Sequence, residues 1–170
     1  MSHKIVAMVI VIMGASGSGK TTIGRALAVE LGWRYVDGDE AHSASNIAKM
    51  RAGIPLTGAD RNPWLAALHA LIARAIERRE HTVVACSALK ARYRDALRGD
   101  LHPVRFVFPR APAAVLQHRL EARGPHFFNP SLLQDQLATL EEPDPAEALI
   151  LDATAPLEDN LSAIRREFGV

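Results

Sequence analysis

The chain has 170 residues, of which 48% are hydrophobic and 23% are charged, and its formal net charge is +1 at pH 7. This composition predicts one ordinary globular domain over residues 1–170, and it excludes a disordered chain or a strongly basic nucleic-acid-binding surface. The single cysteine, Cys86, cannot form an internal disulfide. Its apolar neighbours indicate a packed thiol, which suits a reducing cytoplasm.

The apolar run from Ile5 to Met13 is the first predicted element. Because Lys4 precedes it, the run resembles the start of a secretory signal peptide, but a glycine-rich loop follows in place of a cleavage site. The run is also too short to span a bilayer. We therefore expect a buried strand here and no membrane partner.

Apolar segments of this kind alternate with helical patterns along the chain. The predicted strands, each β-branched or continuously apolar, are Ala7–Met13, Arg34–Val36, Thr82–Cys86, Val104–Phe108 and Ala148–Leu151. A helix is expected from Lys20 to Leu31, closed by Gly32. Asn62-Pro63 and Asn129-Pro130 each predict an N-cap followed by proline at the first helical position. The alternation predicts an α/β fold with right-handed crossovers, a five-stranded parallel sheet and ligands at the carboxyl ends of its strands.

Residues Gly14 to Thr21 read GASGSGKT and match the phosphate-loop pattern G-x-x-x-x-G-K-[ST] between a strand and a helix. Glycines let backbone N–H groups surround phosphates, and the helix N-terminus favours their charge. Lys20 is the expected catalytic cation, and Thr21 is the expected Mg²⁺ ligand. The predicted ATP-binding residues of this loop are Gly14, Ala15, Ser16, Gly17, Ser18, Gly19, Lys20, Thr21 and Thr22. The alternative, a simple Gly/Ser turn, requires no lysine. The fold expected is therefore the three-layer αβα P-loop NTPase fold.

Two carboxylates lie at the carboxyl end of the second strand, in the segment Asp37-Gly38-Asp39-Glu40, and this strand is expected to neighbour the strand before the phosphate loop. Acids beside a triphosphate repel it unless Mg²⁺ or a substrate hydroxyl uses them. The alternative is an acidic helix N-cap, a role that Asp39 can also serve. In phosphoryl transfer a carboxylate accepts or orients the hydroxyl proton, which favours a functional role for at least one of them.

Cations follow the third strand and precede a predicted helix. Lys90 and Arg94 are four residues apart near a helix start, where an anionic ligand offsets their unfavourable position, and Arg61 is placed to bind a carboxylate. A solvated basic helix face is the alternative. Arg119 and Arg123 form a second pair with this spacing, ahead of a break at residues 124–129, and together they suggest a closing lid. An ordinary surface helix hairpin is the alternative reading.

The phosphate loop does not identify the acceptor, because kinases, GTPases, motors and nucleotide sensors share it. The short chain and the absence of an N-K-x-D sequence favour a compact kinase. The histidines show no metal-ligand spacing, and only His42 and His126 lie near the proposed site.

Over nearly its whole length the chain resembles the gluconokinase family of small P-loop carbohydrate kinases. The matching segments, in order, are the phosphate loop, Asp37-Gly38-Asp39 with His42, Asn46–Met50, Gly53–Leu56, Asp60-Arg61, Pro63-Trp64, Cys86–Lys90, Tyr93–Asp95, Arg119-Leu120, Arg123, His126–Phe128 and Leu140–Pro143. The resemblance implies transfer of phosphate from ATP to the 6-hydroxyl of D-gluconate, with Mg²⁺, in a homodimer. It also implies a lid at about residues 120–142.

The resemblance further implies a role for each matched residue. Asp39 would bind and deprotonate the acceptor hydroxyl, and Asp37 would support Mg²⁺ through water. Arg119 would flank the nucleotide base, and Arg123 would act on the phosphates as a catalytic residue. The implied substrate residues are Asp39, His42, Arg61, Lys90, Arg94 and His126. A kinase for shikimate or another sugar acid, and a non-catalytic nucleotide sensor, remain alternatives.

Overall fold

The structure is a computed structural model that describes residues 6–123 and 129–170. Its strands are β1 (Val9–Ile12), β2 (Arg34–Asp37), β3 (Thr82–Ala85), β4 (Val104–Arg110) and β5 (Ala148–Asp152). Its α-helices are α1 (Lys20–Leu31), α2 (Ala44–Arg51), α3 (Gly58–Glu77), α4 (Ala91–Arg98), α5 (Ala113–Ala122), α6 (Leu133–Thr139) and α7 (Leu157–Phe168). Two short 3₁₀ helices are η1 (Gly38–Ala41) and η2 (Pro130–Leu132).

The strands form one parallel sheet in the order β2-β3-β1-β4-β5. The central strand β1 pairs with β3 and β4, so that Val9 lies opposite both Thr82 and Val104. Every residue of β1 and β3 is buried, as expected of strands covered on both faces. The predicted five-stranded parallel α/β fold is confirmed.

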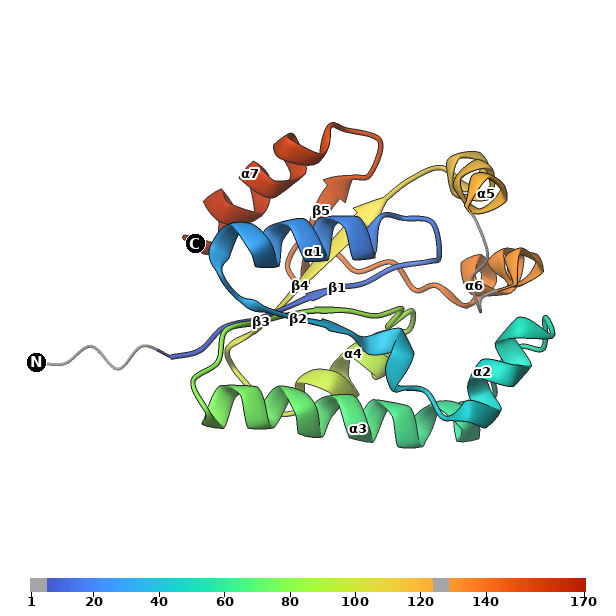
Figure 1. Cartoon of the computed structure of the whole chain (residues 1–170), viewed down its shortest axis with the longest axis horizontal. Coiled ribbons are helices and arrows are strands. Elements are labelled where there is room, and N and C mark those ends of the chain that lie inside the picture. The colour runs from blue at the N-terminus through green and yellow to red at the C-terminus, as the bar shows by residue number, and fades with distance from the viewer. Residues whose placement is uncertain (1–5, 124–128) are drawn as a thin grey trace, which may run out of the picture.

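Helices cover both faces of the sheet, giving three layers. In Figure 1, α1 and α7 lie on one face, and α3 and α4 lie on the other. Ile10, Ile12 and Leu27 belong to the apolar core on the α1 and α7 side, whereas Val11 and Leu68 belong to the core on the other side. The alternation of side chains along β1 thus supplies both cores.

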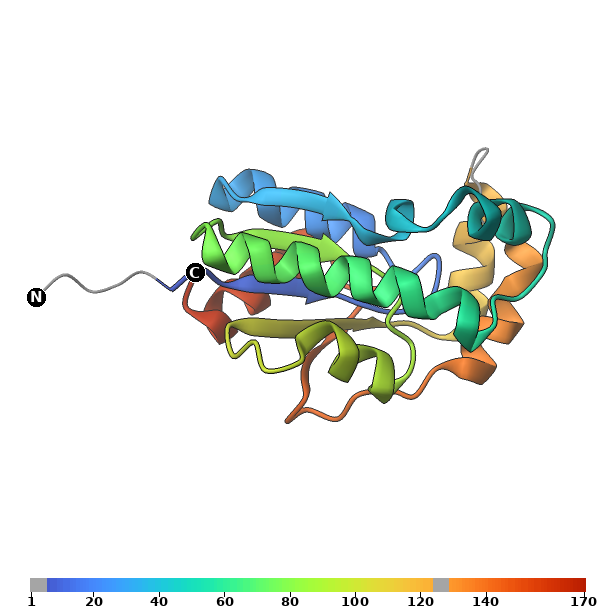
Figure 2. The ribbon, with the colours of Figure 1, turned by 90° about the horizontal axis from the view of Figure 1, so that it is seen from below.

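The remaining helices gather at one end of the sheet. Figures 1 and 2 show α2, α5 and α6 beyond the arrowheads of the strands, at the carboxyl ends where α/β proteins bind ligands. A third apolar cluster joins Met50 of α2, Leu116 of α5 and Leu133 of α6 to Ala15 in the phosphate loop. The elements around the predicted site therefore share a small core of their own.

The start of α3 differs from the prediction. Asn62 does not cap this helix, which begins at Gly58 with Thr57 as the N-cap. Thr57 and Asp60 form a reciprocal capping box that satisfies the first N–H groups. Pro63 lies inside the helix on an exposed face, where the carbonyl that loses its N–H partner can bond to water. The stronger cap outweighs the proline signal.

The predicted helix α1, the cap at Asn129 and the packed Cys86 agree with the structure. Helix α1 has the predicted bounds, with Gly32 as its C-cap. The Asn129 side chain caps η2, and α6 follows it. Cys86 is buried, as expected of a packed thiol. The lid over residues 120–142 stays a prediction, because residues 124–128 lie outside the described residues. Among the helices of the described ranges, none has the length and apolar character needed to cross a bilayer.

Candidate active site

The phosphate loop connects β1 to α1 in a conformation that its glycines permit. Gly17 has φ +84°, and a Cβ built on it would lie 3.0 Å from the carbonyl oxygen of Leu116. A side chain here would be strained and would also push against α5. The glycine therefore lets the loop and α5 approach each other closely.

The N-terminus of α1 is left open for an anion. Its N-cap, Gly19, offers no capping side chain, and no acidic residue occurs in the first turn. The hydroxyl of Ser18 is buried in the loop without a hydrogen-bond partner among the described residues. Unsatisfied donors at a helix N-terminus are the arrangement that binds phosphate.

Lys20 adds a buried cation to this open helix end. It is only 7% exposed, and its Nζ donates to the carbonyl oxygens of Gly14 (2.9 Å) and Ala15 (3.3 Å). Within the described chain no carboxylate forms an ion pair with it. A buried ammonium without a charged partner is costly, so the loop residues fit a bound polyphosphate.

A cavity of about 340 Å³ lies over this loop. It is lined by Ser16, Gly17, Ser18, Gly19, Lys20, Thr21, Thr22, Ile23, Asp37, Asp39, Arg119, Arg123, Ala153, Ala155, Leu157 and Asn160. The structure thus brings together the loop residues from Ser16 onward, both acids and both arginines. Gly14 and Ala15 do not line the cavity; their carbonyl groups hold Lys20 instead.

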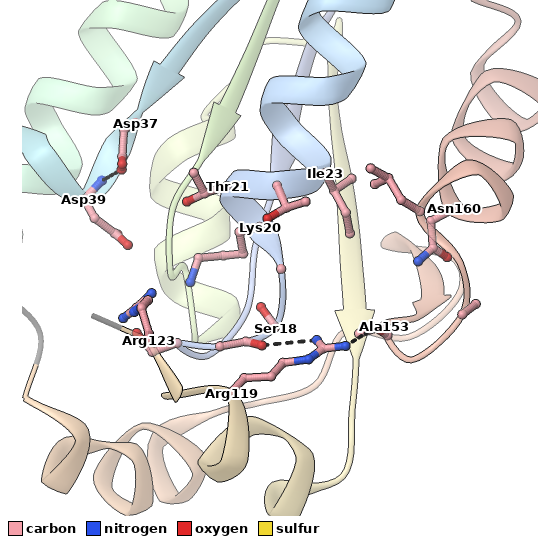
Figure 3. A pocket seen from close by; sticks show the side chains of 16 residues that line it. Ser18, Lys20, Thr21, Ile23, Asp37, Asp39, Arg119, Arg123, Ala153 and Asn160 are labelled. Atoms are coloured by element: carbon pink, nitrogen blue, oxygen red, sulfur yellow. Dashed lines mark hydrogen bonds between the residues drawn. The ribbon is translucent and has the colours of Figure 1, made fainter. Parts of the chain in front are cut away.

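Arg119 and Arg123 reach the loop in different ways. Arg119, in α5, donates from Nη1 to the Gly17 carbonyl (3.2 Å) and from Nη2 to the Ala153 carbonyl (2.7 Å), so it bridges the loop and the segment after β5. Arg123 follows the end of α5 as its C-cap, and Figure 3 shows it on the side of the cavity nearest Asp39. Burial lowers the pKa of Arg123, and the charge of Asp39 offsets part of this effect. Arg123 therefore lies on the acidic side of the phosphate loop, whereas Arg119 reaches from the loop toward Ala153.

The two acids are held at the carboxyl end of β2. Asp37 Oδ1 accepts from the backbone N–H of Asp39 (3.1 Å), which makes Asp37 the N-cap of η1, and Asp39 Oδ1 accepts from the N–H of Ser87 (3.3 Å). The capping role considered for Asp39 thus belongs to Asp37. Burial, and then the neighbouring charge of Asp39, raise the pKa of Asp37. A cation bound between Thr21 and Asp37 would stabilise the charged form of Asp37.

A second and smaller cavity, of about 50 Å³, opens beside the first. It is lined by Ser16, Asp39, His42, Met50, Pro55, Leu56, Arg61, Ser87, Leu89, Leu132, Asp135 and Gln136. Ser16 and Asp39 line both cavities. The nucleotide-sized cavity and the second, polar cavity therefore lie side by side, with Ser16 of the phosphate loop and the Asp39 carboxylate between them.

His42 lies in the second cavity as a neutral ring. It stacks on Trp64 with ring centroids 4.3 Å apart, and its Nδ1 lies 3.2 Å from Nδ2 of Asn46. Nδ2 of Asn46 can only donate, so Nδ1 of His42 accepts and Nε2 carries the proton. Burial, with a contribution from the charge of Arg61, lowers the pKa of His42 to about 4. The ring is therefore a fixed, uncharged donor at neutral pH.

Of the two remaining predicted cations outside the core, Arg61 lines a cavity and Lys90 does not. Arg61, in the second turn of α3, lines the second cavity, and its guanidinium group lies 5.5 Å from the centre of the Tyr93 ring. Lys90 is the N-cap of α4 and lines neither cavity.

Arg94 is the clear departure from the predicted site. It is 1% exposed, its Nε lies 2.6 Å from Oε1 of Glu147, and its Nη1 donates to the Ala88 and Leu89 carbonyls. The anion expected beside it is an internal carboxylate and not a substrate. The substrate role assigned to Arg94 is corrected to a structural one.

Some lining residues gave no signal in the sequence. Leu157 and the buried Asn160, whose Nδ2 donates to the Asp152 carbonyl (3.0 Å), close the far end of the nucleotide cavity. Asp135 and Gln136, in the first turns of α6, close the second cavity. The predicted substrate residue His126 lies outside the described residues.

Comparison with known proteins agrees with this geometry. The sequence model of a protein family described as "AAA domain" matches residues 9–143. A gluconokinase of Gluconobacter oxydans is 46% identical over 141 residues, covering 83% of this chain and 79% of the relative. A crystal structure of a sugar kinase from Janibacter sp. HTCC2649 superposes with a TM-score of 0.91 at 41% identity, covering 96% of this chain and 95% of the other. A crystal structure of a gluconokinase from Sinorhizobium meliloti 1021 gives a TM-score of 0.80 at 42% identity, with 95% and 94% covered.

Proposed function

The chain belongs to the gluconokinase family, and we propose that it transfers the γ-phosphoryl group of ATP to the 6-hydroxyl of D-gluconate. The observation that carries the proposal is the junction of the two cavities. Ser16 and Asp39 line both, so a phosphate held over α1 and a hydroxyl held beside Asp39 would meet at one place. Positioning of this kind accounts for most catalysis in phosphoryl transfer.

The nucleotide side would be held by the loop and by α5. The N–H groups from Gly17 to Thr22 and the ammonium group of Lys20 would bind the phosphates, and Arg119 would lie along the base. Lys20 would exchange its present carbonyl partners for phosphate oxygens, a charge-assisted and therefore stronger interaction. Arg123 would neutralise charge that develops on the transferred group.

Asp39 would act on the acceptor. In the transfer step the 6-hydroxyl oxygen forms a bond to the γ-phosphorus, the bond from that phosphorus to the bridging oxygen breaks, and ADP leaves. The hydroxyl proton passes to Asp39, whose Oδ1 is already fixed by the Ser87 N–H. This hydrogen bond keeps the carboxylate directed toward the junction of the cavities.

Arg61 and His42 would bind the rest of the sugar acid. Arg61 supplies the charge that pairs with the gluconate carboxylate, and neutral His42 supplies an N–H for a hydroxyl. The second cavity is smaller than ordinary ligand pockets, so binding requires a lining element to move outward. The Pro55–Leu56 connection, which lies in a loop, is one such element.

The remaining parts of the proposal rest on the family resemblance and on residue chemistry. Mg²⁺ is the proposed metal, held by the Thr21 hydroxyl and through water by Asp37, where it would supply positive charge to the phosphates. The proposed assembly is a homodimer. A cytoplasmic location suits the lone buried thiol of Cys86.

An ADP-release assay over a panel of acceptors tests the function. We expect strong stimulation by D-gluconate and little by shikimate or by buffer alone. Stimulation by another sugar acid in place of gluconate would assign a different acceptor to the same site. ATP binding without stimulation by any acceptor would indicate a nucleotide sensor and would refute the kinase proposal.

A further inference from the structure

One hydrogen bond joins α6 to the phosphate loop. Oε1 of Gln136 accepts from the backbone N–H of Ser16 at 2.8 Å. Ser16 is 8% exposed and lies at the junction of the two cavities. A neutral side chain from a distant element therefore occupies one N–H group of the loop at the point where the acceptor and the phosphates meet.

This hydrogen bond fixes which way the Gln136 amide faces. Only the carbonyl oxygen of a glutamine can accept, so Oε1 is the atom on Ser16, and Nε2 is directed away from the loop. In the described part of the chain, nothing accepts a hydrogen bond from Nε2. Because Gln136 lines the second cavity, its two N–H donors are available to a ligand there.

The neighbouring residue makes this turn of α6 suited to a polyol. Asp135 lines the same cavity, and its carboxylate can only accept hydrogen bonds at neutral pH, whereas Nε2 of Gln136 can only donate. A hydroxyl group both donates and accepts. Adjacent hydroxyls of a sugar acid would therefore find one partner of each kind in this turn, while the charge of Arg61 is left for the carboxylate.

We infer that Gln136 is a substrate-binding residue that donates from Nε2 to an acceptor oxygen beside the site of phosphoryl transfer. The inference rests on the proposed function and deepens it, because it assigns recognition of the polyol to α6. Outward movement of the Pro55–Leu56 connection, which lies in a loop, can widen the cavity without breaking the hydrogen bond to Ser16.

The test is Gln136→Met, which keeps the length of the side chain and removes its acceptor and both donors. Loss of one neutral hydrogen bond should raise the KM for gluconate about three- to tenfold. The affinity for a non-hydrolysable ATP analogue, measured by calorimetry, should not fall, because the freed Ser16 N–H can bond to phosphate. If Gln136 only tied α6 to the loop, its replacement would instead weaken nucleotide binding.

Gln134→Met is the matched control, since Gln134 is exposed on the same helix. It should leave both constants as in the wild type, and thermal unfolding of each variant reports whether the fold is kept. Gln136→Ala, which does not add an apolar side chain, should reproduce the change in KM. Unchanged KM in both Gln136 variants of an active enzyme would overturn this inference alone. A wild-type protein without gluconate-dependent ADP release would overturn the proposed function and the inference with it.

Discussion

Replacing His42 by phenylalanine should flatten the dependence of stability on pH. The pKa of His42 in the folded chain is about 4, whereas an unfolded histidine has a pKa of 6.5. Between these two values the unfolded state binds the proton and the folded state does not, so stability falls as the pH falls. The contribution of His42 is fully present above pH 6.5, and about 3 kcal/mol of it is lost by about pH 4.

Urea unfolding of wild type and His42→Phe measures this contribution. Phenylalanine keeps a ring against Trp64 but cannot titrate, and it loses the hydrogen bond from Asn46, so the variant should be less stable at neutral pH. From about pH 7 to about pH 5 the wild type should lose about 2 kcal/mol more than the variant. Replacing the exposed His118 by glutamine serves as the control and should follow the wild type. Equal losses in wild type and His42→Phe would refute a buried, neutral His42.

Three further substitutions test the site and its support. Asp39→Asn should lower kcat on the order of 10²- to 10⁴-fold with ATP affinity kept, and near-normal turnover would exclude Asp39 as the base. Arg94→Ala should lower the free energy of unfolding in urea by about 3 kcal/mol, because it leaves Glu147 without its partner. The KM for gluconate should not change. Adding Glu147→Gln should recover part of the lost stability. A raised KM with normal stability would return Arg94 to the substrate site. Gly38→Ala would place a Cβ 2.8 Å from that of Cys86. It should lower the free energy of unfolding by about 1–3 kcal/mol and reduce kcat by shifting Asp39. Unaltered stability and turnover would contradict this packing.

Features set by nearby residues were predictable from the sequence. The sheet confirms all five predicted strands, and the signal is clearest for β1 and β3, because their burial on both faces requires continuously apolar segments. The phosphate loop is equally local, since its glycines, Lys20 and the following helix lie within one stretch of chain. The expected pairing of β2 with the phosphate-loop strand is wrong, because β3 lies between β2 and β1. Asp37 and Asp39 still line the nucleotide cavity, because parallel strands bring their carboxyl ends to one edge of the sheet.

Features set by distant residues were not predictable in this way. The role of Arg94 depends on Glu147, which lies 53 residues away in a segment with no recognisable pattern. Gln136 and Asn160 are polar residues within ordinary helices, and only the fold shows that they face a cavity. The predicted start of α3 is wrong for a different reason: the helix begins at the capping box of Thr57 and Asp60, upstream of the Asn62-Pro63 signal.

Phosphorus NMR of a mixture of the protein, ATP, Mg²⁺ and D-gluconate tests the central claim most directly. If the two cavities bring the γ-phosphate and the acceptor together beside Asp39, the ATP signals should decline as those of ADP and one new phosphate monoester grow in equal amount. ATP that is bound but unchanged, or hydrolysed to inorganic phosphate with no ester formed, would contradict the account.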